Sequence, residues 1–423
     1  MSEVARLSET PAGIRVVTET VPDMRSVALG FWVRTGSRDE SESEAGVSHF
    51  LEHLLFKGTP ELSAVEISEL LDGIGAQFNA FTSKEATHLY ARFLDRHLER
   101  AFGVLGDMFL SPTLAEIDSE RQVVIEEIAM YGDDPDSIAH DLIAEAVFGD
   151  TPLGRPIIGR AEVIGSIPND RIRQYHDAHY TGPAIVISAA GNVDHDELLS
   201  LASELAPGSG ESAAPVGAQA AAAGAVRAFE KETEQYHLVV GNPGIDRSDE
   251  RRFCLAVLDS ILGGSASSRL FTRIREERGL AYSVGTYAEQ YSDSGLFAIH
   301  AGTRGENLGE VCEILAEEMS KIATEAPGID EVERAKELVK GRLVLAEESN
   351  AARMSRIGRA ALHDLPILTL DEMLERIDAV DGQEVLDLAG EILGRSAPSS
   401  ACVGPDTELI ENATAVLEGV AAA

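Results

Sequence analysis

Hydrophobic positions along the chain follow two periods, one typical of strands and one typical of helices. The first half shows a strand pattern at residues 27–36, a helical pattern at 48–58, a strand pattern at 76–93 and a helical pattern at 95–110. The second half shows the same order of patterns, at residues 235–244, 251–264, 280–302 and 306–322. A repeated order of elements predicts two related domains.

Residues 207–226 separate the two halves and consist mainly of Gly, Pro, Ser and Ala, which is typical of a linker. Strand patterns at 182–194 and 397–406 close the two halves. We therefore predict an α+β fold that arose by internal duplication, in which each domain is a mostly antiparallel sheet with helices packed on one face. The predicted bounds are an N-terminal domain at 1–206 and a C-terminal domain at 227–423.

The helical pattern at 48–58 carries three polar side chains among apolar ones. His49, Glu52 and His53 stand at positions i, i+3 and i+4, so they share one helix face. Two histidines with this spacing can bind one zinc ion if a third protein ligand and an open position for water are present. The alternative is a set of hydrogen-bonded core residues, in which Glu52 pairs with a nearby lysine such as Lys57.

The second half lacks the polar triplet. If the glycines that end the two apolar helices, Gly58 and Gly263, are aligned, then Cys254, Val257 and Leu258 match the three polar positions. The same helix can therefore pack without imidazoles, and the triplet is an addition to it. We predict a metal site in the N-terminal domain and none in the C-terminal domain.

A third ligand is expected on another element, and residues 116–134 form a helical pattern that could provide it. At about 100° per residue, one stripe of this helix holds Glu120, Val123, Val124, Glu127 and Tyr131. Glu126 points away from the stripe. An unpaired carboxylate among apolar side chains is costly, whereas a metal ion and the second nitrogen of a ligand histidine would satisfy two carboxylates. The alternative is two half-exposed acids at the edge of an amphipathic helix.

The segment HFLEHLLFKGTP, followed by ERQVVIEEIAMY, resembles the pitrilysin (insulinase) family of inverted zinc metallopeptidases. The likeness extends over nearly the whole chain and is greatest to two-domain members, such as bacterial processing proteases and the catalytic subunit of mitochondrial processing peptidase. It implies one Zn²⁺ per chain, bound by His49, His53 and Glu127. It also implies that Glu52 is the base that activates water and that Glu120 is an acidic residue that supports a ligand.

The resemblance also implies how a substrate is held. Asn79 and Ala80 match an edge strand on which an extended peptide adds by backbone hydrogen bonds. Arg275 and Tyr282 match a pair, seven residues apart, that binds the substrate and its developing oxyanion. From the residues alone, the alternatives are an ordinary sheet strand, an arginine in a surface salt bridge and a core tyrosine.

We therefore expect a zinc metalloendopeptidase that hydrolyses short or unfolded peptides inside a chamber. Longer family members build this chamber from four domains, so a two-domain chain is expected to form a homodimer, or a heterodimer with an inactive paralogue. One alternative is a catalytically inactive member that binds peptides or serves as a scaffold. Another is a zinc hydrolase of non-peptide amides.

Charge narrows the class of partners. The chain has 35 basic and 72 acidic residues, a formal net charge of −37, so nucleic acid is excluded as an expected partner. The acidity either supports solubility or attracts peptides that carry Arg or Lys.

Three cysteines are too few for a disulfide framework or a thiolate zinc cluster. With no signal-peptide core and no run of roughly 20 apolar residues, we expect a cytoplasmic protein with no membrane partner.

Overall fold

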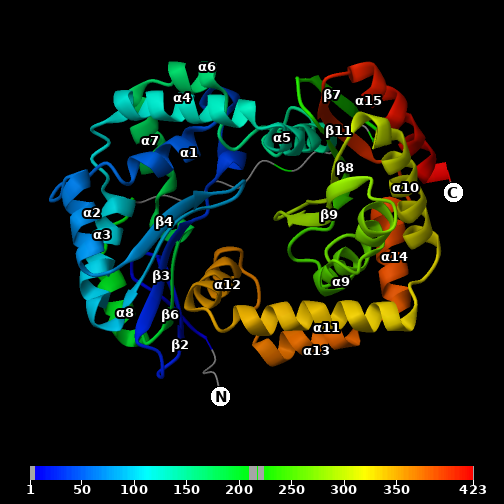
Figure 1. Ribbon diagram of the computed structural model, residues 1–423. Coiled ribbons are helices and arrows are strands. Elements are labelled where there is room, and N and C mark those ends of the chain that lie inside the picture. Colours follow the sequence, from blue (N-terminus) through cyan, green and yellow to red (C-terminus); the bar gives the residue numbers. More distant parts are fainter. Residues whose placement is uncertain (1–4, 209–216, 218–222, 423) are drawn as a thin grey trace. The chain divides into compact units, whose positions relative to one another are not determined.

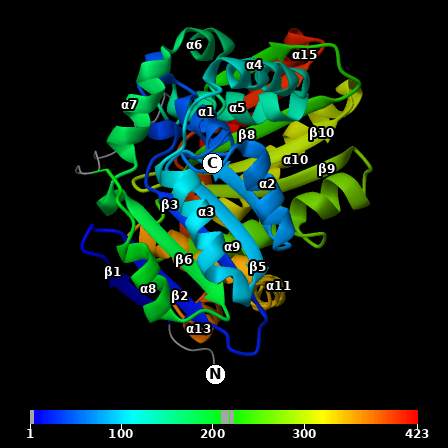
Figure 2. The ribbon, with the colours of Figure 1, turned by 90° about the vertical axis from the view of Figure 1, so that its left-hand side faces the viewer.

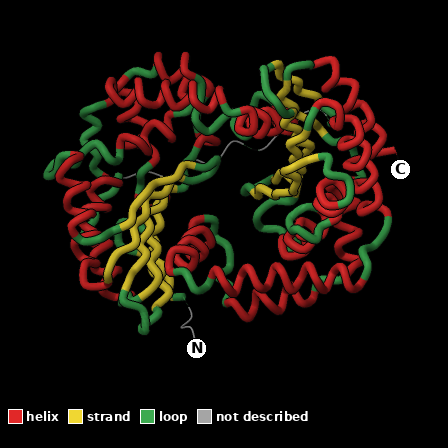
Figure 3. Tube along the Cα trace, viewed as in Figure 1, coloured by secondary structure: helices red, strands yellow, loops and turns green. Residues whose placement is uncertain are grey.

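The computed structural model describes residues 5–208, 217 and 223–422 and contains two compact units, each built around one sheet (Figure 1, Figure 3). The first unit comprises the described parts of residues 1–129, 156–216 and 344–369, and the second those of 130–155, 217–343 and 370–423. Each unit therefore includes one segment from the opposite half of the sequence. The predicted linker, 207–226, lies mostly outside the described residues.

The first unit contains a six-stranded sheet in the order β1-β2-β6-β3-β5-β4. Its strands are β1 (Arg6–Glu9), β2 (Arg15–Thr20), β3 (Ser26–Val33), β4 (Gln77–Thr82), β5 (Thr87–Leu94) and β6 (Ile185–Gly191). Strands β2 and β6 are parallel, and all other neighbours are antiparallel. Strand β4 pairs only with β5, so it forms one edge of the sheet.

The second unit repeats this topology in a five-stranded sheet with the order β7-β11-β8-β10-β9. Its strands are β7 (Val226–Glu230), β8 (Tyr236–Gly244), β9 (Ala281–Gln290), β10 (Gly295–Thr303) and β11 (Ser399–Gly404). Its single parallel pair, β7 with β11, corresponds to β2 with β6. The predicted α+β fold with two related, mostly antiparallel sheets is confirmed.

Helices cover one face of each sheet and form its main core. In the first unit they are α1 (Val47–Leu54), α2 (Ala64–Gly73), α3 (Leu98–Leu110), α4 (Ile117–Asp133), α6 (Ala161–Ser166), α7 (Asn169–His179) and α8 (His195–Ser203). In the second unit they are α9 (Arg252–Leu262), α10 (Gly305–Thr324), α11 (Ile329–Ala346), α13 (Leu370–Ala379), α14 (Gly382–Leu393) and α15 (Thr407–Thr414). None of the described helices is both long and apolar enough to cross a membrane.

The opposite face of each sheet is covered by one helix from the other half of the chain, which the sequence analysis did not anticipate. In the first unit this helix is α12 (Asn350–Leu362), which packs on β2, β3 and β6; in the second unit it is α5 (Pro135–Phe148), which packs on β8 and β11 (Figure 1). The compact units differ from the predicted bounds by these exchanged helices.

The sequence of β3 reflects burial on both faces. Leu29 and Phe31 point into the core beneath the helical layer, whereas Ala28 and Trp32 contact the cluster formed with α12. A strand covered on both faces has a nearly continuous apolar sequence instead of an alternating one. The apolar run at residues 27–36 therefore contained a signal for a second covering element.

Ion pairs add to the apolar contacts of α12. The carboxylate of Glu19 on β2 is buried and pairs with both Arg353 and Arg356 of the helix. Arg356 also pairs with Glu347, Nε to Oε1 at 2.8 Å. A buried carboxylate without a partner is strongly unfavourable, so these arginines specify where the helix lies on the sheet.

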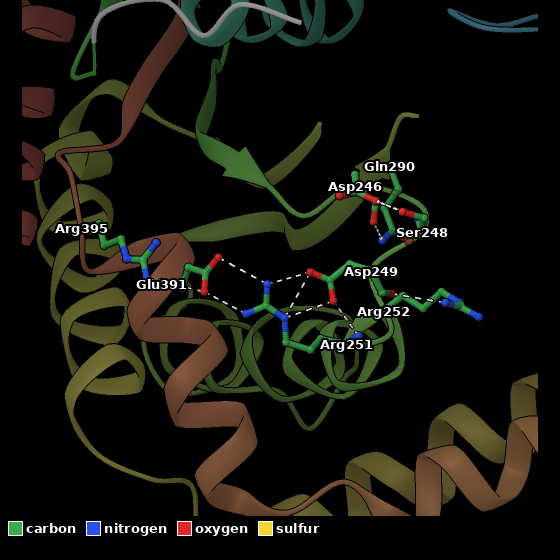
Figure 4. Close-up of polar contacts among 8 residues, drawn as sticks. All are labelled: Asp246, Ser248, Asp249, Arg251, Arg252, Gln290, Glu391 and Arg395. Carbon is green, nitrogen blue, oxygen red and sulfur yellow. Dashed lines mark hydrogen bonds and ion pairs between the residues drawn. The ribbon is translucent and has the colours of Figure 1, made fainter. Parts of the chain in front are cut away.

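Helix α9 of the second unit corresponds to α1 of the first. The guanidinium of Arg251 holds the start of α9, with Nη2 2.7 Å from Oδ2 of Asp249 and Nη1 2.8 Å from Oε2 of Glu391 on α14 (Figure 4). Figure 2 shows the ribbon of α9 from another side. Cys254, Val257 and Leu258, which match the polar triplet, are all buried in the core. At these three positions α9 therefore packs as ordinary apolar core.

The α12 contacts predict a specific loss of stability. Ile357 on α12 has 0% exposure, so Ile357→Ala should lower the free energy of unfolding by about 2–5 kcal/mol. Trp32 is the single tryptophan of the chain and packs in the same cluster, so its fluorescence during urea denaturation reports on this unit. Ile329→Ala, at a position that is 82% exposed, is the matched control and should shift the curve by less than about 0.5 kcal/mol. Equal effects of the two variants would contradict the packing of α12.

Candidate metal centre

A buried carboxylate holds the N-terminus of α1. Glu40 accepts hydrogen bonds from the backbone N–H groups of Gly46 (2.6 Å to Oε2) and Ser48 (2.7 Å to Oε1). Burial raises the pKa of Glu40 to about 8, although both backbone hydrogen bonds act to lower it. Gly46 has a φ of 96°, and a Cβ there would lie 2.7 Å from the carbonyl oxygen of Ile158, so this start requires glycine.

Helix α1 divides its side chains between two environments. Its apolar side chains, from Val47, Phe50, Leu51 and Leu54, lie in the core of the first unit. His49, Glu52 and His53 are partly buried on the other side of the helix. The amphipathic spacing thus turns the three polar groups toward α4 and β4, whose side chains contact them.

Helix α4 presents two carboxylates toward α1. Glu120 is buried, Glu127 is partly buried and Glu126 is exposed, as the helical spacing predicted. The apolar stripe is narrower than the sequence suggested, because Val123 and Tyr131 are exposed. The stripe on α4 is therefore mixed, with its acidic members directed toward the histidines.

His49, His53 and Glu127 form a compact set of donor atoms that lie within 4.8 Å of one another. Oε2 of Glu127 lies 3.1 Å from Nε2 of His53 and 3.8 Å from Nε2 of His49. Ligands at about 2.1 Å from a tetrahedral zinc ion are about 3.4 Å apart, so the observed spacing fits zinc. Among described residues, this is the one group of His, Cys, Asp or Glu that satisfies this geometric test.

The protonation state of His49 also suits a ligand. Burial, together with the nearby His53, lowers the pKa of His49 to about 4. Its imidazole is therefore neutral near pH 7, and a metal ion can bind to it without displacing a proton.

Glu120 supports the set through His53. Its Oε1 lies 3.0 Å from Nδ1 of His53, which leaves Nε2 of that ring directed toward Glu127. Its Oε2 lies 2.7 Å from Nζ of Lys57. Lys57 therefore pairs with Glu120 and not with Glu52, so the sequence-based alternative for Lys57 is wrong. A carboxylate that fixes the ring of a metal-binding histidine is a common supporting group.

Glu52 stands beside the donor set and is held by a residue that the sequence analysis did not single out. The hydroxyl of Thr82, at the end of β4, donates to Oε2 of Glu52 at 2.6 Å. Burial raises the pKa of Glu52, and Glu127 adds to the rise, whereas Thr82 and His53 oppose it. A carboxylate with a raised pKa is a better base for chemistry near neutral pH.

The structure also places the predicted substrate residues. Asn79 is exposed on the edge strand β4, and its Oδ1 accepts a hydrogen bond from the N–H of Ala80 at 2.9 Å. Arg275 and Tyr282 lie in the second unit, where Nη1 of Arg275 donates to the carbonyl of Tyr282 at 2.8 Å. Both line a pocket of about 350 Å³, and the Tyr282 ring is exposed rather than in the core.

Comparison with known proteins gives the family. Residues 15–161 match a family model described as insulinase (peptidase family M16), and residues 166–339 match one described as the peptidase M16 inactive domain. An uncharacterized zinc protease of Streptomyces coelicolor is 42% identical over 95% of this chain and 89% of its own length. The chain belongs to peptidase family M16. A second relative, an uncharacterized zinc protease of Bacillus subtilis, is 43% identical over 90% of this chain and 93% of its own length.

Solved structures agree on the M16 fold. A protease from Helicobacter pylori has a TM-score of 0.88 at 19% identity, with 96% of this chain and 100% of that chain covered. A structure from Pseudomonas fluorescens, described as a peptidase M16 inactive domain, has a TM-score of 0.85 at 20% identity, with 95% and 98% covered. At these identities the likeness supports the two-domain architecture and carries no statement about activity.

The donor geometry predicts the metal content of variants. Purified protein should contain about one zinc ion per chain, because the matching helix of the second unit offers only Cys254, Val257 and Leu258. His49→Ala and Glu127→Gln should each lose most of the metal, as measured by inductively coupled plasma mass spectrometry. Glu126→Gln, one residue away and exposed, is the matched control and should retain it. Metal loss in the Glu126 variant but not in the Glu127 variant would show that Glu126, and not Glu127, is the ligand.

Proposed function

We propose that this M16 protein is a zinc metalloendopeptidase that hydrolyses peptide bonds in short or unfolded peptides, with Glu52 as general base. The observation that carries the proposal is the combination of a complete donor set (His49, His53 and Glu127) with a carboxylate on the same face of α1. Inverted motifs of this kind occur in zinc peptidases.

Each residue of the site has a separate role in the proposed hydrolysis. When bound, zinc supplies a Lewis acid that polarises the scissile carbonyl and lowers the pKa of a water molecule. Glu52 takes the proton from that water and returns it to the departing amine. Glu120, charged and held by Lys57, keeps the ring of His53 in the orientation that presents Nε2.

The substrate in this proposal is an extended peptide that adds to the free edge of β4. Edge strands offer unpaired backbone groups, which bind a peptide largely independently of its sequence. The N–H of Ala80 now donates to the side chain of Asn79, so Asn79 must release this group when a peptide binds. Peptides that carry Arg or Lys are the favoured class, because the chain has a net charge of −37.

The alternative is an inactive member of the family that binds peptides or serves as a scaffold. The family model described as inactive covers residues 166–339, which include the apolar helix α9 and none of the metal-binding candidates. The complete donor set lies within residues 15–161, so the active function is the better supported of the two. The edge strand favours peptides over other amides as substrates.

We also propose that two chains act together. In longer members of the family, the pair that corresponds to Arg275 and Tyr282 serves the zinc site of the opposite half of the chamber. In a homodimer, this pair would contribute to the site of the partner chain; in a heterodimer with an inactive paralogue, one active site would remain.

The role of Glu52 can be tested separately from metal binding. Glu52→Gln should retain zinc but lower kcat by about 10²- to 10⁴-fold, because the amide cannot accept the proton. Turnover is measured on a peptide library by mass spectrometry, with and without a chelator, and the library includes neutral and Arg- or Lys-containing sequences. Glu126→Gln should cleave like the wild type. A zinc-loaded wild-type protein that cleaves no peptide would favour the scaffolding function.

A mixing experiment tests the shared site. Glu52→Gln and Arg275→Ala homodimers should each be nearly inactive. After subunit exchange, random pairing makes about half of the dimers mixed, and each mixed dimer has one intact site of two, so about a quarter of wild-type activity should return. If exchange is verified by mass spectrometry and activity stays at the parental level, the pair does not serve the partner's site.

A further inference from the structure

Thr82 connects the candidate general base to the edge strand. It is the last residue of β4, and only 5% of it is exposed. Its Oγ1 donates to Oε2 of Glu52 at 2.6 Å, a short distance typical of a hydroxyl that bonds to a charged oxygen. No sequence motif marks this threonine as part of the site.

A glutamate needs such a partner to act as a base. Its side chain has three rotatable bonds, and a base must lie within hydrogen-bond reach of the proton that it takes. The core-facing side of α1 fixes the backbone at Glu52 but does not fix the carboxylate itself. The hydroxyl of Thr82 fixes Oε2 of this carboxylate, and the backbone N–H of Thr82 also donates to the carboxylate.

The position of Thr82 along β4 adds a second consequence. Asn79 and Ala80 lie three and two residues earlier, respectively, on the same strand, which spans about 3.3 Å per residue. A peptide paired with this edge would therefore lie within about 10 Å of the residue that orients the base. Strand β4 would then position both the scissile bond of the peptide and the carboxylate of Glu52.

We propose that Thr82 is a positioning residue that holds the carboxylate of Glu52 in its working orientation and ties it to the strand that receives the peptide. This inference rests on the proposed peptidase function. It concerns an interaction between two residues of the chain, so it can also be examined without turnover.

The experiment compares three variants. Thr82→Val keeps the shape and the β-branched side chain but removes the hydroxyl, and Thr82→Ser keeps the hydroxyl. Thr87→Val is the matched control, because Thr87 is the buried cross-strand partner of Thr82 and its hydroxyl donates to the carbonyl of Thr35 at 3.0 Å. Zinc content, kcat and KM are measured for each variant, and crystal structures of Thr82→Val and Thr82→Ser show the conformation of Glu52.

Thr82→Val should lower kcat by about 10- to 100-fold with KM changed less than about twofold, since a misplacement of about 1 Å has an effect of this order. Zinc content should be unchanged in all variants. Thr82→Ser should recover kcat to within about threefold of the wild type, and Thr87→Val should match the wild type. In the crystal structures, Glu52 should keep one conformation in the serine variant and lose it in the valine variant.

Any of three results would overturn the inference. The first is a wild-type kcat in Thr82→Val, and the second is a kcat in Thr82→Ser as low as that in Thr82→Val. The third is an equal loss of kcat in the control Thr87→Val. An unmoved Glu52 in the crystal structure of Thr82→Val would overturn it as well, whatever the activity. A wild-type protein without chelator-sensitive turnover would instead remove the proposed function, and the conformation of Glu52 would still decide whether Thr82 positions it.

Discussion

The candidate metal centre depends on one constraint, which is that a buried carboxylate must have partners. Glu120 is 4% exposed, and its charge is supported by His53 on one oxygen and Lys57 on the other. Removal of either partner would leave a carboxylate poorly compensated in a low-dielectric environment. The contact therefore fixes α4 against α1, and with it the distance between Glu127 and the two histidines.

The second unit shows what the same fold looks like without this constraint. Helix α9 occupies the position of α1 in an equivalent sheet topology, and it buries Cys254, Val257 and Leu258 where α1 carries the polar triplet. Its start is held by exposed and half-exposed ion pairs around Arg251 instead of a buried carboxylate such as Glu40. An equivalent fold thus exists without the polar triplet of the first unit, which favours a chemical role for these groups.

The sequence was informative where the signal was local. Helical spacing separated Glu127 from Glu126, and the repeated order of elements identified both sheets. It did not reveal that α5 and α12 exchange between the halves, because amphipathic spacing shows that a helix has an apolar face but not which sheet that face covers. The partner of Lys57 and the role of Thr82 were missed for a similar reason. Both depend on contacts between residues far apart in the chain, which spacing cannot report.

The exchange of α12 also determines when the first unit can complete its folding during translation. The first sheet is complete once β6, which ends at Gly191, has left the ribosome, but α12 begins only at Asn350. At about 5–20 residues per second, the apolar face formed by Val17, Ala28 and Val186 remains uncovered for on the order of ten to thirty seconds. Helix α5 leaves the ribosome before the strands that it covers, so its own apolar face stays uncovered until they are made. Folding of either unit therefore finishes only late in translation, and the nascent chain exposes apolar surface until then.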